Sequence, residues 1–164
     1  MVPRLFVKLA VPQGHQKLAH IRVDSQDDPF IPSQGLLTEG EIANLVGQAP
    51  QEIVWLVGVE PNWGGRADPA EYATVCLYYY ENINAIDPTA KVASPGILNW
   101  DYTCSQSSDC DYMSGILWMA QFFGVYQNLT GELPPVDVWT IDVYRVDYNW
   151  EAVLHSAVAI SQIE

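Results

Sequence analysis

The sequence predicts an α/β fold: a partial (half) TIM-type (β/α) barrel of about five parallel strands with amphipathic helices. Short runs rich in β-branched residues alternate along the chain with longer stretches of helical period, which is the pattern of βαβ units around a parallel sheet. One of these runs, residues 53–59, is apolar on both faces, as a parallel strand between helices and a barrel interior must be. The helix starts carry recognisable N-caps.

The expected strands are short, and turn residues or helical patterns bound them. They are residues 5–11, 18–23, 53–59, 91–93 and 136–144. The first helix is expected to follow Thr38, because Glu41 stands three residues later in the spacing of a capping box. Pro50 ends it. Its inward-facing residues are expected to be Ile42, Leu45, Val46 and Ala49.

The second helix is expected to begin after Asp68, since Pro69 suits the first helical position and Glu71 completes a capping-box arrangement. Its apolar stripe comprises Tyr72, Val75, Cys76, Tyr79, Ile83 and Ile86. Cys76 is therefore expected to be a buried small hydrophobe and not a nucleophile. Pro88 stops the helix.

Two further helices are expected. One covers residues 112–128 and ends before Gly131; its buried residues are expected to be Met113, Ile116, Leu117, Ala120 and Phe123. The last helix begins at the N-cap Asn149, with Trp150, Val153, Leu154, Ala157 and Val158 facing inward. It reaches the end of the chain without a C-cap, so we expect that further sequence once followed it.

Length and composition fit a single domain, residues 1–164, and exclude several partners. With 49% hydrophobic residues the chain can bury one sizeable core. The formal net charge of −13 repels polyanions, so neither nucleic acid nor a membrane is an expected partner, whereas a neutral polysaccharide meets no such barrier. Pro3 and Pro12 break the first sixteen residues, which therefore lack the apolar run of a signal peptide or membrane span.

The cysteine spacing bears on the compartment. Cys104 and Cys110 flank a short polar stretch that could close a small disulfide loop. A disulfide there would indicate an oxidising compartment and hence a secreted or extracellular protein. The alternative is two unrelated surface thiols.

No metal site and no cofactor is expected. The three histidines have no metal-ligand spacing; they are His15, His20 and His155. The sequence also contains no nucleotide-binding motif, no serine-hydrolase motif and no zinc signature.

The most specific local signal is VGVEPNWGG, residues 57–65, where an apolar strand ends in a carboxylate and opens into a glycine-bearing loop. Side chains at the carboxyl ends of barrel strands point into the active-site mouth. Residues 55–62 resemble the end of strand four in clan A-type (β/α)-barrel glycoside hydrolases, where an Asn-Glu-Pro motif carries the acid/base glutamate. The resemblance implies that Glu60 is the general acid/base, with Asn62 expected as a substrate-binding residue. The alternative is a strand-terminal loop carboxylate without a catalytic role.

The resemblance extends to residues 69–91 and 135–144, which look like the following helix and the sixth strand of such barrels. Two features depart from it: Val59 stands where the clan usually has Asn, and residues 142–144 read Asp-Val-Tyr where His-x-Tyr is common. The nucleophile glutamate of the clan is on strand seven, before which this chain stops. The resemblance thus covers about the middle half of a barrel.

Glycosidic cleavage needs one carboxylic acid to protonate the leaving oxygen and a second carboxylate as nucleophile or base. The second group is expected to be Asp142, Asp101 or a carboxylate of a partner chain. Asp142 is preferred because its strand would end at the same mouth as the strand before Glu60; alternatively, it pairs with a neighbouring Arg. Aromatic residues just beyond strand ends are expected to stack on sugar rings; they are Trp63, Trp100 and Tyr144.

The sequence therefore predicts an O-glycoside hydrolase that acts on β-linked glycosides or glucans and binds oligo- or polysaccharide. The alternative is a catalytically inactive carbohydrate-binding or structural assembly module derived from a glycosidase barrel, which the missing strand-seven glutamate favours. Because a half barrel leaves open sheet edges, a homodimer is expected; the alternative is that flanking sequence absent from this chain covers them.

Overall fold

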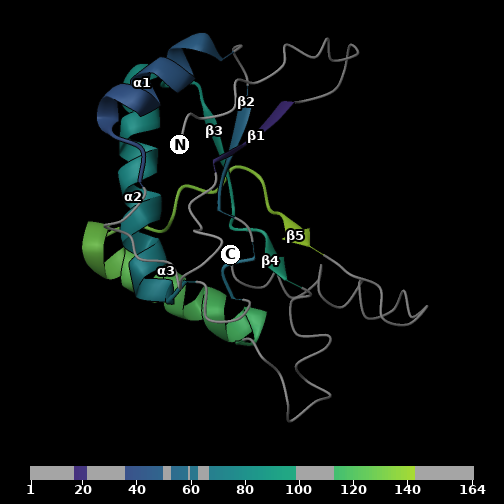
Figure 1. Ribbon diagram of the computed structural model, residues 1–164. Coiled ribbons are helices and arrows are strands. Elements are labelled where there is room, and N and C mark those ends of the chain that lie inside the picture. The colour runs from purple at the N-terminus through teal and green to yellow at the C-terminus, as the bar shows by residue number, and fades with distance from the viewer. Residues whose placement is uncertain are drawn as a thin grey trace, which may run out of the picture.

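The structure is a computed structural model of the chain (Figure 1). It describes residues 17–21, 36–49, 53–58, 60–62, 67–98 and 113–142, with only the backbone described for Lys17, Leu98 and residues 141–142. In chain order the elements are β1 (Lys17–Ile21), α1 (Glu39–Gln48), β2 (Ile53–Val57), α2 (Pro69–Ile86), β3 (Lys91–Ala93), β4 (Ile97–Leu98), α3 (Gly115–Thr130) and β5 (Ile141–Asp142). The expected strand at residues 5–11 and the expected helix from Asn149 lie outside the described residues.

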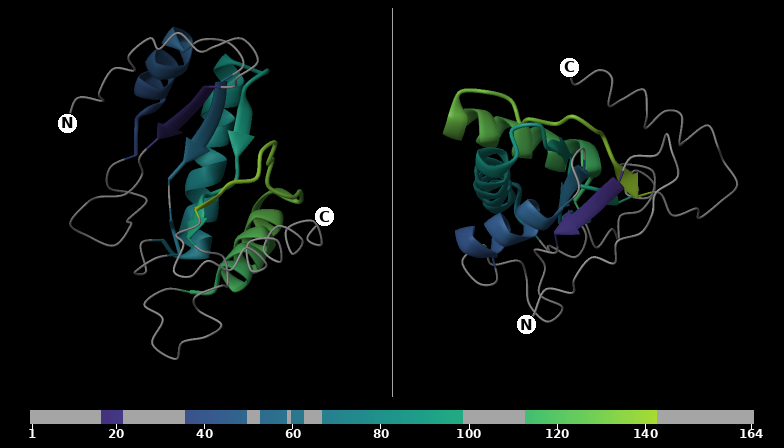
Figure 2. Two further views of the ribbon diagram at one scale, coloured as in Figure 1. Left: turned by 90° about the vertical axis from the view of Figure 1, so that its right-hand side faces the viewer. Right: turned by 90° about the horizontal axis from the view of Figure 1, so that it is seen from above.

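The strands pair in parallel, and their order in space follows their order in the chain. β1, β2 and β3 form one sheet, and β4 pairs with β5 in a second. A bridge between Ala93 and Val138 links the two sheets. Parallel neighbours need crossover connections, and α1, α2 and α3 supply them in an arc on one side of the strands (Figure 2). This arrangement is part of a (β/α) barrel, so the predicted α/β fold class is confirmed.

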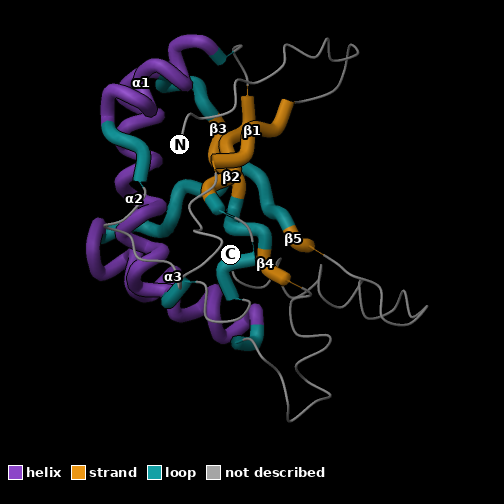
Figure 3. The backbone as a smooth tube through the Cα atoms, in the orientation of Figure 1, coloured by secondary structure: helices purple, strands orange, loops and turns teal. Residues whose placement is uncertain are grey.

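Two predicted strands differ in detail from the structure. β3 and β4 are two successive pieces of a single broken strand (Figure 3), of which the sequence predicts only the first. The expected strand at residues 136–144 appears as the bridge at Val138 followed by the two-residue β5. The break lies at Ser94–Gly96, where Pro95 has no N–H to give to a ladder.

β2 is buried on both faces, as predicted for a central parallel strand. Ile53, Trp55 and Val57 join the core that the helices form. Val54 and Leu56 pack with Ala93 on the opposite face. The two clusters correspond to the helix layer and the interior of a barrel.

The predicted starts of α1 and α2 are confirmed, whereas α3, expected over residues 112–128, covers Gly115–Thr130 with Ser114 as its N-cap. The hydroxyl of Thr38 accepts the Glu41 N–H at 3.3 Å while the Glu41 carboxylate accepts the Thr38 N–H at 2.8 Å, which completes the capping box. These hydrogen bonds lower the pKa of Glu41. The Asp68 carboxylate accepts the Ala70 N–H at 2.8 Å, and Pro69 opens α2.

Two tyrosines of α2 hold the backbone that leads into α1. The Leu37 N–H donates to the hydroxyl oxygen of Tyr79 at 3.0 Å. The Tyr78 hydroxyl donates to the Leu37 carbonyl at 2.9 Å. Both backbone groups of Leu37 are therefore satisfied by neighbouring residues of one helix, which fixes where α1 starts relative to α2.

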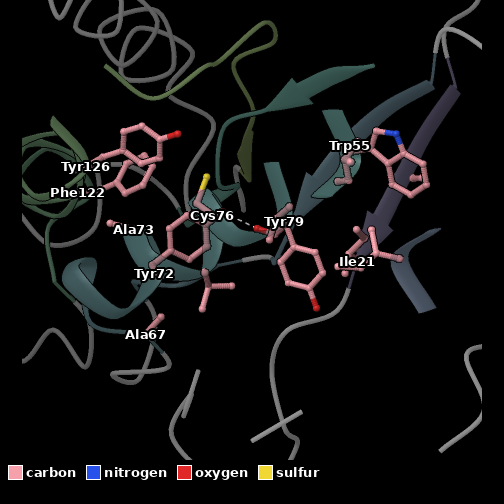
Figure 4. Close-up of a cluster of buried hydrophobic side chains, with 14 of the residues drawn as sticks. Ile21, Trp55, Ala67, Tyr72, Ala73, Cys76, Tyr79, Phe122 and Tyr126 are labelled. Atoms are coloured by element: carbon pink, nitrogen blue, oxygen red, sulfur yellow. Dashed lines mark hydrogen bonds between the residues drawn. The ribbon is translucent and has the colours of Figure 1, made fainter. Parts of the chain in front are cut away.

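The core between the helices is aromatic (Figure 4). Figure 4 shows Tyr72 of α2 beside Phe122 of α3. Tyr72 meets Trp118 and Phe122 edge-on, with ring centroids 5.2 and 5.3 Å apart. Cys76 lies buried in the same cluster, as predicted, and burial raises the pKa of its thiol from 9.0 to about 12. The predicted stripe of α2 is buried apart from Ile86, which is exposed at the end of the helix.

The predicted buried face of α3 is wrong. Met113, Ile116 and Leu117 are exposed, by 38%, 38% and 59%, Ala120 is exposed as well, and Phe123 is only half-buried. The buried residues are Gly115, Trp118, Met119, Phe122 and Tyr126. The helix contains no charged residue, so its sequence carries two apolar stripes. The stripe that contains the aromatic residues Trp118 and Phe122 packs on Tyr72.

Candidate functional site

The predicted acid lies directly beyond the carboxyl end of β2. Gly58, with φ 72°, continues the pairing with β1 by donating its N–H to the Ile21 carbonyl at 2.9 Å. Glu60 follows with φ 48°, the one non-glycine residue with positive φ among the described residues. Its N–H donates to the Gly96 carbonyl at 2.7 Å, and its side chain is half-buried. A non-glycine residue held in this region is a local strain, and such strain concentrates at functional sites.

The turn after Glu60 is fixed to the start of α3. The Asn62 amide donates to the Met113 carbonyl at 3.2 Å, and the Met113 N–H donates to the Asn62 carbonyl at 3.2 Å. Asn62 is only 2% exposed. The side chain thus serves to tie the loop in this structure, and its expected contact with substrate stays a prediction.

A second contact braces the same loop. The Ala67 N–H donates to the Pro61 carbonyl at 3.1 Å, and the Ala67 carbonyl accepts the indole N–H of Trp118 at 3.1 Å. Trp118 is buried in the aromatic core. The loop that follows Glu60 is therefore anchored at both of its described ends to buried parts of the fold.

A polar pair that the sequence analysis did not single out lies beside this edge. Ser94, at the break between β3 and β4, is 1% exposed, and its hydroxyl oxygen accepts the Thr140 N–H at 2.8 Å. The Thr140 hydroxyl donates to the Ser94 carbonyl at 2.8 Å. The signal available in the sequence is Ser94-Pro95-Gly96, a strand-breaking run inside an apolar stretch.

For Asp142, the preferred second carboxylate, the structure describes only the backbone. Asp142 is in register with Leu98 at the end of β5. Because all these strands are parallel, the end of β5 and Glu60 lie at the same edge, with the broken strand β3–β4 between them. The remaining predicted site residues lie outside the described residues; they are Asp101, Trp63, Trp100, Tyr144 and the cysteines Cys104 and Cys110.

Within the described part of the chain, no group of three or more His, Cys, Asp or Glu residues could hold a metal ion. None of the helices in that part has both the length and the hydropathy that a membrane span requires.

Parallel strands in chain order, joined by helical crossovers, make up part of a (β/α) barrel, a fold class that includes glycoside hydrolases, and Glu60 lies at the carboxyl edge of these strands. Two solved structures of that class share the fold of this chain. One is a GH128 (subgroup II) endo-beta-1,3-glucanase from Pseudomonas viridiflava, with a TM-score of 0.54 and 22% sequence identity over 76% of this chain. The other is a GH128 (subgroup II) endo-beta-1,3-glucanase from Sorangium cellulosum, with a TM-score of 0.58 and 17% identity over 91% of this chain.

The likeness covers 45% of the Pseudomonas viridiflava structure and 52% of the Sorangium cellulosum structure, so the chain spans about half the length of these enzymes. No protein-family model matches the chain, and no curated protein sequence matches it. At 22% and 17% sequence identity, these comparisons show a shared fold and no more than that.

Proposed function

We propose that the chain is part of a glycoside hydrolase that cleaves β-linked glucans, with Glu60 as the general acid/base. One observation carries the proposal: Glu60 is held in the left-handed region at the carboxyl edge of a parallel β/α unit, by a 2.7 Å hydrogen bond from its N–H to Gly96. Side chains at this edge form the active site in (β/α)-barrel enzymes. A fold shared with two endo-beta-1,3-glucanases supports the reaction class.

The proposed chemistry uses two carboxyl groups. Glu60 donates a proton to the leaving oxygen of the glycosidic bond, and a second carboxylate acts as nucleophile or activates water. We propose Asp142 for the second role, with Asp101 or a partner chain's carboxylate as alternatives. One strand separates β2 from β5, which puts their backbones roughly 10 Å apart, a spacing from which two side chains can reach the separation of an inverting pair.

The proposed substrate is a β-1,3-glucan, by analogy with the two structurally similar enzymes. The net charge of −13 places no barrier before a neutral polymer. From the short polar spacer between Cys104 and Cys110 we also propose a disulfide between them, and hence a secreted protein. Mass spectrometry without reductant should find these two cysteines linked and Cys76 free; two free thiols in protein from an oxidising compartment would contradict this.

The test of the function is Glu60→Gln, assayed by release of reducing sugar from soluble β-1,3-glucan. The substitution keeps shape and removes the proton, so we expect kcat to fall about 10²-fold or more. Glu71→Gln, the same chemical change at an exposed position in the first turn of α2, is the control and should keep the wild-type rate. Equal rates for Glu60→Gln and wild type would contradict the proposal.

A second candidate function is carbohydrate binding without cleavage. The shared fold covers 45% and 52% of the two glucanases, and a fold shared over about half of an enzyme does not by itself carry its catalytic function. Binding of β-1,3-glucan oligosaccharides by calorimetry, together with no sugar release at any enzyme concentration, would favour this candidate over the first.

We also propose a homodimer. The exposed apolar residues Met113, Ile116 and Leu117 lie together at the start of a helix without charges, and exposed apolar patches mark interaction surfaces. Light scattering should give at least twice 18.3 kDa, and Leu117→Lys should lower that mass. A wild-type monomer that unfolds cooperatively would contradict the dimer.

A further inference from the structure

The strand pair beside Glu60 contains a β-bulge. Ala93 pairs with Val138, and Ile97 pairs with Ile141. Between these two pairs the first strand has three residues, at 94–96, and its partner has two, at 139–140. One strand therefore carries an extra residue, and a bulge of this kind bends the strand and redirects its backbone groups.

The side chains of Ser94 and Thr140 close the bulge. The Ser94 N–H donates to the Val138 carbonyl at 2.8 Å, which continues the ladder by one step. Beyond that step the ladder is replaced by side-chain bonds: the Ser94 hydroxyl oxygen accepts the Thr140 N–H, and the Thr140 hydroxyl donates to the Ser94 carbonyl, both at 2.8 Å. The Ser94 hydroxyl itself has the Thr140 carbonyl at 3.4 Å. We call this pair the Ser94–Thr140 clasp.

The Gly96 carbonyl lies directly beyond the clasp along the chain. Gly96 is the last residue of the bulge, two residues after Ser94, and its carbonyl accepts the Glu60 N–H at 2.7 Å instead of pairing with the strand that carries Thr140. Glu60 sits at φ 48°, a conformation that a glutamate keeps only when its surroundings hold it there. Without the bulge, the backbone at Glu60 would lose the acceptor that its N–H uses.

We infer that Ser94 is a positioning residue, which sets the location of the Glu60 carboxyl through the bulge and the Gly96 carbonyl. This inference rests on the proposed role of Glu60 as acid/base. Ser94 does not touch the reacting atoms in this scheme. Its contribution is to hold the backbone geometry from which the acid works, and small misplacements of a catalytic group are costly in rate.

The structure offers a matched control on the same two strands. At the other end of the pair, the Asp137 carboxylate accepts the Val92 N–H at 2.9 Å, and the Asp137 N–H donates to the Val92 carbonyl at 2.9 Å. Asp137→Ala removes a side-chain bond between the same strands, but on the far side of the Ala93–Val138 bridge from Gly96. It therefore separates loss of strand pairing from displacement of Glu60.

The first measurement is kinetic. Ser94→Ala and Thr140→Val should lower kcat on soluble β-1,3-glucan about 10- to 100-fold with KM changed less than about twofold, because the acid is displaced while the binding surface remains. Thr140→Ser keeps the hydroxyl, so this variant should have a kcat near the wild-type value. Asp137→Ala should keep kcat even where its midpoint in urea falls as far as that of Ser94→Ala. Equal losses of kcat in Asp137→Ala and Ser94→Ala would overturn the inference.

The second measurement does not depend on activity. The Glu60 amide proton should lose its protection from hydrogen exchange in Ser94→Ala and Thr140→Val, and keep it in Thr140→Ser and Asp137→Ala. If the wild type releases no sugar, the proposed function fails, and this amide still decides whether the clasp places Glu60. An unchanged Glu60 amide in a folded Thr140→Val protein would overturn the inference, whatever the activity.

Discussion

The hydroxyl of Tyr72 in α2 donates a hydrogen bond to the carbonyl of Val57, the last residue of β2. The bond ties the strand that precedes Glu60 to the helix that follows it. Burial raises the pKa of Tyr72 well above its usual value, so the hydroxyl remains a donor at any ordinary pH.

Tyr72→Phe should destabilise the fold by about 1–3 kcal/mol, because it leaves a buried carbonyl without its partner while the ring still packs. Urea unfolding followed by tryptophan fluorescence measures the change. Tyr80→Phe, at a half-buried position of the same helix, is the control and should stay within about 0.5 kcal/mol of wild type. If the two substitutions cost the same, the Tyr72–Val57 bond contributes nothing special.

The backbone strain at Glu60 can be measured by comparing two variants that both lack the carboxylate. At φ 48° a residue with a Cβ is penalised and glycine is not, so Glu60→Gly should be more stable than Glu60→Ala by about 1 kcal/mol. At an ordinary position the order is the reverse. Thermal or urea unfolding of the two proteins gives the difference, and an Ala variant more stable than the Gly variant would show that Glu60 is not held in the left-handed region.

The leaving group should distinguish the roles of the two proposed carboxylates. An aryl glycoside with an acidic phenol needs little protonation as it departs, so Glu60→Gln should cleave it far better than it cleaves the glucan. Asp142→Asn should slow both substrates alike, since a nucleophile or base is needed whatever leaves. Steady-state rates on both substrates test this pair of expectations, and a uniform loss in Glu60→Gln would remove the acid role.

Cys76 should make the fold sensitive to alkali and its thiol inert near neutral pH. Burial raises its pKa from 9.0 to about 12, so between these values the unfolded thiol ionises while the folded one stays protonated. Its contribution to stability is complete below pH 9 and is lost as the pH rises toward 12. Urea midpoints between pH 8 and 11 should fall less in Cys76→Ala than in wild type. Rapid iodoacetamide labelling of Cys76 in the folded protein at pH 8 would contradict the burial.

Much of the fold follows from local sequence signals that act over a few residues. The capping box from Thr38 to Glu41 and the Asp68-Pro69 start are contacts within one turn, so their spacing alone determines them. The run from Ile53 to Val57 has no polar side chain and has to be covered on both faces.

The features that the sequence did not predict depend on partners far along the chain. The prediction of the buried face of α3 was wrong because this face depends on the packing of Trp118 and Phe122 against Tyr72, a residue of another helix. No charged residue on α3 marks its exposed side. The Ser94–Thr140 clasp joins residues 46 positions apart. The motif predicted the position of Glu60 at the strand end, whereas its hydrogen bond to Gly96 joins residues 36 positions apart and could not be read from the motif.

The two hydrogen bonds between Leu37 and the adjacent tyrosines of α2 affect how α1 unfolds locally. α1 has ten residues, a length at which an isolated helix is marginal in water, and its entry is held by the hydroxyls of Tyr78 and Tyr79. To release α1, both of these bonds must break, and the ring of Tyr79 belongs to the buried core. We therefore expect α1 and α2 to open as one cooperative unit, with the amides of α1 exchanging at the opening free energy of α2.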